Sequence, residues 1–231
     1  MAHTLSYPGR TPDSRPRTLE LLTWEETERL VPSLLRVSQA AYLLHLVELQ
    51  QLATPESVSQ YYDPNNPLVV DRYRERTREI HELGSRIVVE RKEPGSDELL
   101  GFSKWGPAPA MTRDYKGGYF FDGWYVNNIA VDPEAANQGV GSRLMHGSIQ
   151  LNQCDPEAQA VLDAIVGNDA VANRWYREMG FVPRPDVPTD VFGLEGGHIP
   201  EMYYVAPRIG GLVTYLETRH PELQDAQPDF T

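Results

Sequence analysis

A pair of glycines at the start of an expected helix is the feature that most constrains how this chain can fold. Gly139 and Gly141 come soon after Asp132-Pro133, which ends the strand-like run WYVNNIAV, and they precede an apolar helical pattern. Glycine loses more conformational freedom on folding than any other residue, so two glycines in one turn are costly. Such a cost is tolerated where the backbone turns sharply or lies close to an anionic ligand. The stretch therefore predicts a strand–turn–helix unit that presents its backbone N–H groups.

This unit differs from two other phosphate-binding loops. The P-loop pattern G-x-x-x-x-G-K-[ST] is absent, and the dinucleotide-binding fingerprint would need a third glycine at the position of Leu144. What remains is the general property of a helix N-terminus, whose first amides have no partner within the helix and carry partial positive charge. A diphosphate is a ligand that such a site favours. The alternative is a tight turn without a ligand.

Hydrophobic periodicity places this unit within a longer alternation of strands and helices. Thr23 and Glu26 form a capping-box signature that begins a first helix. The expected elements are, in order, a strand at 18–24, that helix, a helix at 69–84, a hairpin at 86–106, a strand at 124–133, a helix after 139, a strand at 160–167, a helix at 168–180 and two further strands before 206. This order predicts an α/β (mixed α+β) fold, with a central mixed β-sheet of about six to seven strands flanked by helices.

The two ends of the chain differ from the region between them. Residues 1–17 are rich in Pro, Arg, Ser and Thr, which predicts a mobile N-terminal tail. Residues 18–206 carry the alternating pattern and are expected to form one domain. Residues 207–231 are interpreted as a C-terminal extension that forms a short helix and then frays.

Charge and cysteine content narrow the classes of function. The formal net charge of −12 argues against nucleic-acid binding and favours a cationic substrate. No apolar run is long enough to span a membrane, so no membrane association is expected. Cys154 is the only cysteine, which suits a reducing compartment and predicts a cytoplasmic location. The histidines show no metal-ligand spacing, so no metal site is expected.

Three motifs together resemble the GNAT-type N-acetyltransferase superfamily. The family has a strand ending in an apolar-Ala-Val-x-Pro run, then a [Q/R]-x-x-G-x-[G/A] loop, and later a helix with Asn, Ala and Tyr before a closing Gly-Phe. The matching residues here are I-A-V-D-P at 129–133, G-V-G at 139–141, and Ala172, Tyr176, Gly180 and Phe181. The motifs span 124–182, and the element order extends the resemblance from about Leu19 to Ala206.

The chain departs from the family pattern at three positions. Ala136 stands where the family has the Gln or Arg of its loop, and Asp169 stands where it has an Asn. Asn127 occupies a strand position at which the family often carries Glu, and an amide cannot take a proton there. Asn127 could instead orient a water or the substrate.

The resemblance implies a fold, a donor and a reaction. The donor is acetyl-CoA, without a metal, and the acetyl group moves directly to a primary amine in a ternary complex. The strand with the I-A-V run is expected to splay from the next strand, so that the pantetheine arm can hydrogen-bond to its edge. The residues expected to bind the cofactor are Ile129, Ala130, Val131, Asn137, Gln138, Gly139, Val140, Gly141, Ser142, Arg143, Asn168 and Asn173.

The resemblance also suggests catalytic and substrate-binding residues. Tyr176 matches the family's proton donor to the leaving thiolate, although it could be a core aromatic residue. Together with Asn127 it forms the predicted catalytic set, and the proton acceptor is left open among Asp122 and other loop carboxylates. Trp124 and Tyr125 are expected to line the acceptor site. Asp163, in the buried strand, is either structural or close to that site. His146 is expected to be exposed.

The predicted acceptor is a small cationic amine. Alternative functions are a protein lysine or N-terminal acetyltransferase, a non-catalytic acyl-CoA-binding sensor, and an interaction module that uses the aromatic residues as a patch. The resemblance further allows a homodimer.

Overall fold

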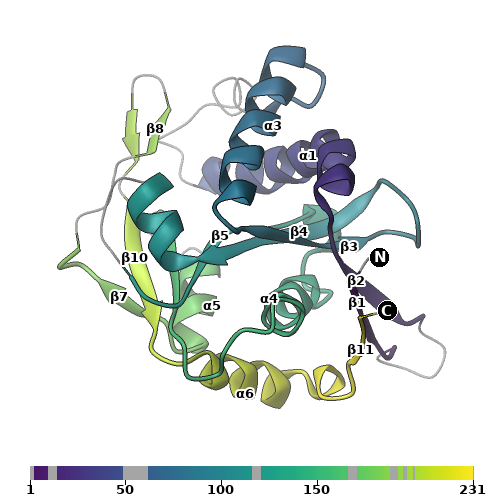
Figure 1. Cartoon of the computed structure of the whole chain (residues 1–231), viewed down its shortest axis with the longest axis vertical. Helices are drawn as coiled ribbons and strands as arrows, with labels where there is room; N and C mark the ends of the chain where they lie inside the picture. The colour runs from purple at the N-terminus through teal and green to yellow at the C-terminus, as the bar shows by residue number, and fades with distance from the viewer. Residues whose placement is uncertain are drawn as a thin grey trace.

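Helices cover both faces of a large twisted sheet (Figure 1). The computed structural model describes residues 3–9, 15–48, 62–115, 121–165, 171–187, 192–194, 197–199 and 201–230. Its strands are β1 (His3–Tyr7), β2 (Arg17–Leu21), β3 (Arg86–Arg91), β4 (Leu99–Pro107), β5 (Trp124–Val131), β6 (Ala160–Ile165), β7 (Val182–Arg184), β8 (Phe192–Leu194), β9 (Gly197–Ile199), β10 (Glu201–Ala206) and β11 (Gln227–Asp229). Its α-helices are α1 (Trp24–Glu48), α3 (Pro67–Glu82), α4 (Val140–Leu151), α5 (Val171–Glu178) and α6 (Ile209–Arg219).

The sheet has nine strands among the described residues, in the order β11-β1-β2-β3-β4-β5-β6-β10-β7. All neighbouring strands are antiparallel except β5 and β6, which are parallel. Strands β8 and β9 form a separate hairpin. The mixed α+β architecture is therefore confirmed, and the sheet is larger than the six to seven strands expected.

One additional strand comes from the predicted N-terminal tail. His3–Tyr7 pairs with β2 along its whole length and with β11 on its other side. The run H-T-L-S-Y alternates polar and apolar residues, and the side chains of Leu5 and Tyr7 are buried in the core, as the period of a strand requires. The prediction of a mobile tail over residues 1–17 is wrong for this segment, because the Pro- and Arg-rich residues that follow concealed the alternation.

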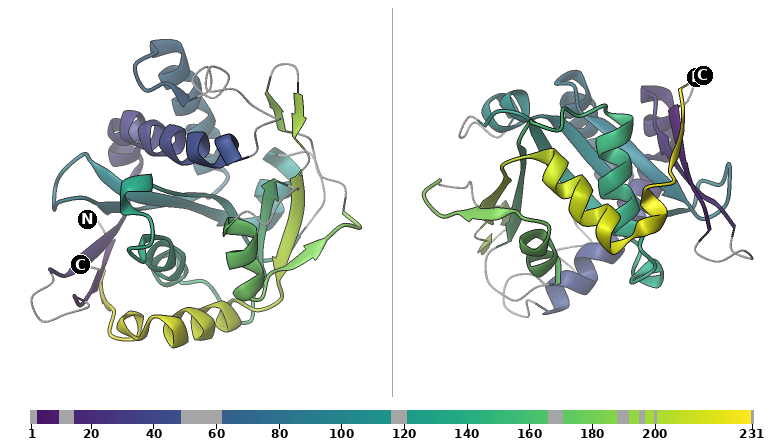
Figure 2. Two further views of the ribbon diagram at one scale, coloured as in Figure 1. Left: turned by 180° about the vertical axis from the view of Figure 1, so that it is seen from behind. Right: turned by 90° about the horizontal axis from the view of Figure 1, so that it is seen from below.

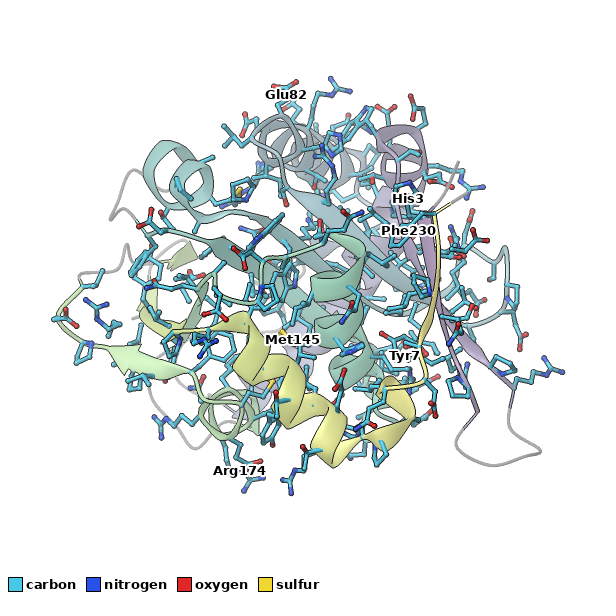
Figure 3. All side chains as sticks on the ribbon, turned by 60° about the horizontal axis from the view of Figure 1, so that its bottom comes forward. His3, Tyr7, Glu82, Met145, Arg174 and Phe230 are labelled. Atoms are coloured by element: carbon cyan, nitrogen blue, oxygen red, sulfur yellow. The ribbon has the colours of Figure 1, made fainter. Side chains whose placement is uncertain are left out.

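The other end of the chain folds back to the same edge. Helix α6 runs beneath α4, and β11 then pairs with β1 (Figure 2). Figure 3 shows His3 and Phe230 close together, and their ring centroids are 5.4 Å apart. The expectation that the C-terminal extension frays after a short helix is wrong for Gln227–Asp229.

The long first helix begins where the capping-box signature predicts. The backbone N–H of Thr23 donates to Glu26 Oε2, and the N–H of Glu26 donates to Thr23 Oγ1. The helix continues through Pro32 as one element. Leu30, Leu34 and Val37 lie on its buried face and pack against the sheet, as their spacing predicts.

Two helical layers result from this arrangement. Helices α1 and α3 lie on one face of the sheet, which we call the α3 face, and α4, α5 and α6 lie on the other, the α4 face (Figures 1 and 2). The predicted hairpin is confirmed as β3 and β4. No helix in the described part of the chain combines the length and the apolar character needed to cross a membrane.

Candidate active site

Strands β5 and β6 diverge in the middle of the sheet. They are paired at only three positions, from Trp124 opposite Ala160 to Val126 opposite Leu162. Beyond this point, residues 127–131 have no β6 partner among the described residues, whereas β6 stays paired with β10 along its length. This edge of β5 is therefore available for hydrogen bonding to an extended ligand. The divergence is the one that the resemblance implied for the strand with the I-A-V run.

A bulge in β5 marks the point of divergence. Lys104 of β4 lies opposite Asn128 and Trp105 lies opposite Val126, which leaves Asn127 without a partner on β4. A bulge bends its strand and redirects the side chains around it. Asn127, the predicted catalytic amide, is thus the bulged residue, and the half-buried Asn127 and Asn128 lie at the opening of the fork between β5 and β6.

The glycine loop has the backbone conformation that its sequence suggests. Gly139, the N-cap of α4, has φ 75° and ψ 8°, and Asn137 also has a positive φ of 61°. Asn is the residue besides glycine that most readily adopts this left-handed conformation. The two positive φ values reverse the chain between Pro133 and α4, so that the loop approaches the end of β5.

The amide groups at the start of α4 have no acceptors among the described residues. No described residue accepts a hydrogen bond from the backbone N–H groups of residues 139–142, whereas the N–H of Gln138 donates to Ala135 at 3.4 Å. A Cβ placed on Gly141 would find only the side chains of Trp175 and Val131, at 3.6 Å or more. A methyl group at Gly141 would therefore make ordinary van der Waals contacts with these two side chains. Backbone amides without acceptors at the start of a helix form an anion site.

Arg143 does not point into this site. Its guanidinium donates to both oxygens of Glu90, at 2.9 and 2.8 Å, and to the carbonyl of Gln138 at 3.0 Å. Both charged side chains are buried. The prediction that the Arg143 side chain binds the cofactor is therefore corrected, because its guanidinium is paired with the buried carboxylate of Glu90. Arg143 instead holds the loop by its Gln138 carbonyl.

Ser142 and His146 face the C-terminal helix and strand β1. The hydroxyl of Ser142 lies 2.9 Å from His220 Nε2. His146 is 2 % exposed, and its Nδ1 lies 3.0 Å from the hydroxyl of Tyr7. Burial lowers the pKa of His146, and Glu217 partly offsets this effect. The expectation of an exposed His146 is wrong, because α6 covers the outer side of α4.

Two neighbouring aromatic residues lie on opposite faces of the sheet. Tyr125 is fully buried on the α3 face, and its hydroxyl donates a hydrogen bond to Asp163 Oδ1. Trp124 packs against the cluster on the α4 face. Successive side chains of a strand point to opposite faces, so the two side chains do not share a face, and their part in an acceptor site stays a prediction.

Asp163 lies at the fork itself. It is the residue after Leu162, the last residue of β6 that pairs with β5. Its half-buried carboxylate binds the Tyr125 hydroxyl, and its Cα lies opposite that of Tyr203 on β10. The sequence left Asp163 as either structural or close to the acceptor site, and its place at the fork favours the second interpretation.

Tyr176 lies on α5, packed between the rings of Trp175 and Phe181. Burial, together with the negative charge of Asp163, raises the pKa of Tyr176 well above its ordinary value. The hydroxyl therefore stays protonated throughout the physiological range, as a proton donor must. Asn173, on the same helix, is buried.

The remaining predicted residues are distributed around the fork. Ala130 packs against α1, while Ile129 and Val131 pack on the α4 face. Val140 belongs to the core beneath α4. Asn168 lies outside the described residues. The described residues contain no cluster of His, Cys, Asp or Glu suited to a metal ion.

One unusual residue near the fork was missed. Lys104 is 4 % exposed, and burial lowers its pKa to about 7. The signal available in the sequence is a lysine in the middle of the apolar run GFSKWG, within an expected strand. A buried ionisable group with a perturbed pKa indicates a functional site more often than a surface charge does.

Comparisons with known proteins agree with this geometry. The family model for the acetyltransferase (GNAT) domain matches residues 84–183, which include the hairpin, the fork, the glycine loop and α5. None of the curated proteins compared with the chain matches it. This match covers the residues that carry the resemblance to the GNAT-type N-acetyltransferase superfamily.

Solved structures share the fold at low sequence identity. A ribosomal-protein-alanine N-acetyltransferase from Brucella melitensis is 16% identical over 81% of this chain and 97% of its own, with a TM-score of 0.52. A histone acetyltransferase HPA2 and related acetyltransferase from Corynebacterium glutamicum is 18% identical over 90% and 97%, with a TM-score of 0.50. The PaiA N-acetyltransferase from Thermoplasma acidophilum, solved with coenzyme A, is 13% identical over 80% and 97%, with a TM-score of 0.50.

Proposed function

We propose that the protein is an acetyl-CoA-dependent N-acetyltransferase that moves the acetyl group directly to a primary amine within a ternary complex. One observation carries this proposal. In the described part of the chain, the amides of residues 139–142 lack acceptors, and they adjoin β5, whose residues 127–131 have no partner on β6. A diphosphate joined to an extended amide-bearing arm, as in coenzyme A, matches both features at once.

The residues present fit this cofactor. The loop provides main-chain donors for the diphosphate, and Gly139 and Gly141 carry no side chains that would shield them. Arg143 fixes the loop through the Gln138 carbonyl. When bound, acetyl-CoA supplies an acetyl group activated as a thioester.

The side chains and amides at the fork then have distinct tasks. Successive N–H groups of a strand point to opposite edges, so alternate residues among 127–131 direct theirs at the open side. One of these, at Ala130 or Val131, stabilises negative charge on the carbonyl oxygen of the acetyl group. Tyr176, which remains protonated, donates its proton to the leaving thiolate. Asn127 orients the acceptor at the bulge.

We further propose that the acceptor is a small cationic amine, a choice supported by the net charge of −12. The test is release of free coenzyme A thiol from acetyl-CoA, with and without a panel of amines and peptides, together with calorimetric binding of acetyl-CoA. Amine-dependent release supports the proposal. Binding without any turnover would instead identify a sensor, and a strong preference for peptides would identify a protein acetyltransferase.

A further inference from the structure

The amino group of Lys104 is buried with hydroxyl groups as its partners. Its Nζ lies 2.8 Å from the hydroxyl of Tyr73 and 3.4 Å from Oγ1 of Thr77, both on α3. It also lies over the Tyr73 ring, 4.2 Å from the ring centroid. Among the described residues, no carboxylate forms an ion pair with it. A buried ammonium without a counter-charge is strongly disfavoured, so the neutral amine is accessible near pH 7.

The groups that contact the Lys104 amino group are hydroxyls and aromatic rings, which stabilise an ammonium ion less than a carboxylate would. From α3, Tyr73 and Thr77 contribute hydroxyls, and the positive charge of Arg76 further lowers the pKa. The neighbouring strands place Ile87 of β3 and the amide of Asn128 of β5 opposite it. Phe102, two residues earlier on β4, adds a second ring on the same face, in the cluster that packs against α1.

Lys104 is also close to the fork. It lies opposite Asn128, next to the bulged Asn127, so that only the width of β5 separates it from the open edge. Its side chain points to the α3 face, on which Tyr125 also lies. Tyr73 is half-buried, so the residue whose hydroxyl contacts the enclosed amino group also reaches the protein surface.

We propose that Lys104 holds the proton that the acceptor amine must lose before it can attack, and that this proton passes through the hydroxyl of Tyr73. The inference rests on the proposed function. The ammonium group of the acceptor gives a proton to the Tyr73 oxygen, while the proton of that hydroxyl passes to the lone pair of Lys104 Nζ. The acceptor becomes a neutral amine and Lys104 becomes an ammonium ion, which returns its proton to water by the reverse route.

Other groups at the fork are less suited to this task. Asn127 is an amide and takes no proton at these pH values. One oxygen of Asp163 is already occupied by the Tyr125 hydroxyl. A proton acceptor works best when its pKa lies near the operating pH, and buried lysines are known to serve as such bases.

The experiment compares the pH dependence of amine acetylation in the unaltered chain and in Lys104→Met, Lys104→Arg and Tyr73→Phe. Met keeps the length of the side chain without a charge, whereas Arg stays protonated throughout. Lys92→Met is the matched control, because Lys92 is exposed on the β3–β4 turn, where it pairs with Glu98. Acetyl-CoA affinity and thermal unfolding are measured for every variant to separate chemistry from folding.

The unaltered chain and Lys92→Met should show kcat/KM rising with pH through a midpoint near 7. All three test variants should lose this midpoint and about 10²-fold in kcat/KM, with unchanged acetyl-CoA affinity. A purely structural role predicts altered unfolding with the midpoint retained, and that result would overturn the inference alone. If the unaltered chain binds acetyl-CoA but acetylates no amine, the proposed function and this inference fail together.

Discussion

Arg143 and Glu90 form a buried two-point ion pair that fixes the glycine loop from behind. The guanidinium reaches both carboxylate oxygens at 2.9 and 2.8 Å and holds the Gln138 carbonyl with its remaining terminal nitrogen. The pair joins β3 to α4, so it connects the sheet to the site that we assign to the diphosphate. Its role is to position the amides.

Arg143→Met should therefore damage both folding and cofactor binding. Removing Arg143 leaves the carboxylate of Glu90 buried without its counter-charge. This loss should cost about 3–5 kcal/mol of unfolding free energy. The double variant Glu90→Gln with Arg143→Met should recover part of this loss, as measured by urea unfolding. Acetyl-CoA affinity should stay reduced in both, because the Gln138 carbonyl is no longer held. Full affinity in the double variant would show that the loop does not need Arg143.

The two loop glycines should respond differently to alanine. Gly139 has φ 75°, so Gly139→Ala forces a left-handed alanine and should cost about 1 kcal/mol in unfolding free energy. Gly141→Ala finds space at 3.6 Å and should leave the unfolding temperature unchanged or slightly raised. Calorimetry should show weaker acetyl-CoA binding by Gly139→Ala, because a turn that leaves the left-handed region moves the loop amides, whereas Gly141→Ala should bind as the unaltered chain does. Equal affinity in Gly139→Ala and the unaltered chain would argue against a role of this turn in binding.

Tyr176→Phe tests the assigned proton donor. We expect kcat to fall by about 10²-fold while acetyl-CoA affinity changes little, because only the proton for the leaving thiolate is lost. Tyr215→Phe is the control, since its hydroxyl makes an exposed contact with Glu178 on α5. Stopped-flow measurement of thiol release would separate the chemical step from product release. Similar rates in both variants would assign Tyr176 to the core.

The buried Lys104 also predicts how stability depends on pH. Its pKa is about 7 in the folded chain and near 10.5 when unfolded, so between these values the unfolded chain binds more protons. The folded state therefore gains stability as the pH rises from about 7 towards 10. Below pH 7 the free-energy cost of burying the charged amine is present in full. Lys104→Met should lack this gain. Thermal unfolding measured from pH 6 to pH 10 checks the sign, and parallel curves for the two proteins would contradict the buried, shifted amine.

The sequence was sufficient to predict the features that depend on neighbouring residues. The capping box of α1, the β3–β4 hairpin and the turn into α4 all follow from local patterns, and the structure confirms them. Pairing partners far apart in the chain were not predictable in this way. The association of β1 with β11, and the cover that α6 gives to His146, depend on contacts across almost the whole sequence.

The candidate site shows the same division. The positive φ of Gly139 could be anticipated from its residue type, whereas the destination of Arg143 depends on Glu90, which lies on another strand. Trp124 and Tyr125 were assigned to one site although adjacent strand residues face opposite sides. Lys104 was missed because its meaning depends on Tyr73 and Thr77 of α3, which only the tertiary fold brings to it.

The most direct measurement is a titration of ¹⁵N-labelled protein, following the backbone amide signals of residues 139–142 as coenzyme A is added. Pantetheine, which lacks the diphosphate, serves as the control ligand. The account predicts large shifts of these amides with coenzyme A and only small ones with pantetheine. Amides that remain unperturbed by saturating coenzyme A, or that respond equally to both ligands, would contradict a diphosphate site at the start of α4.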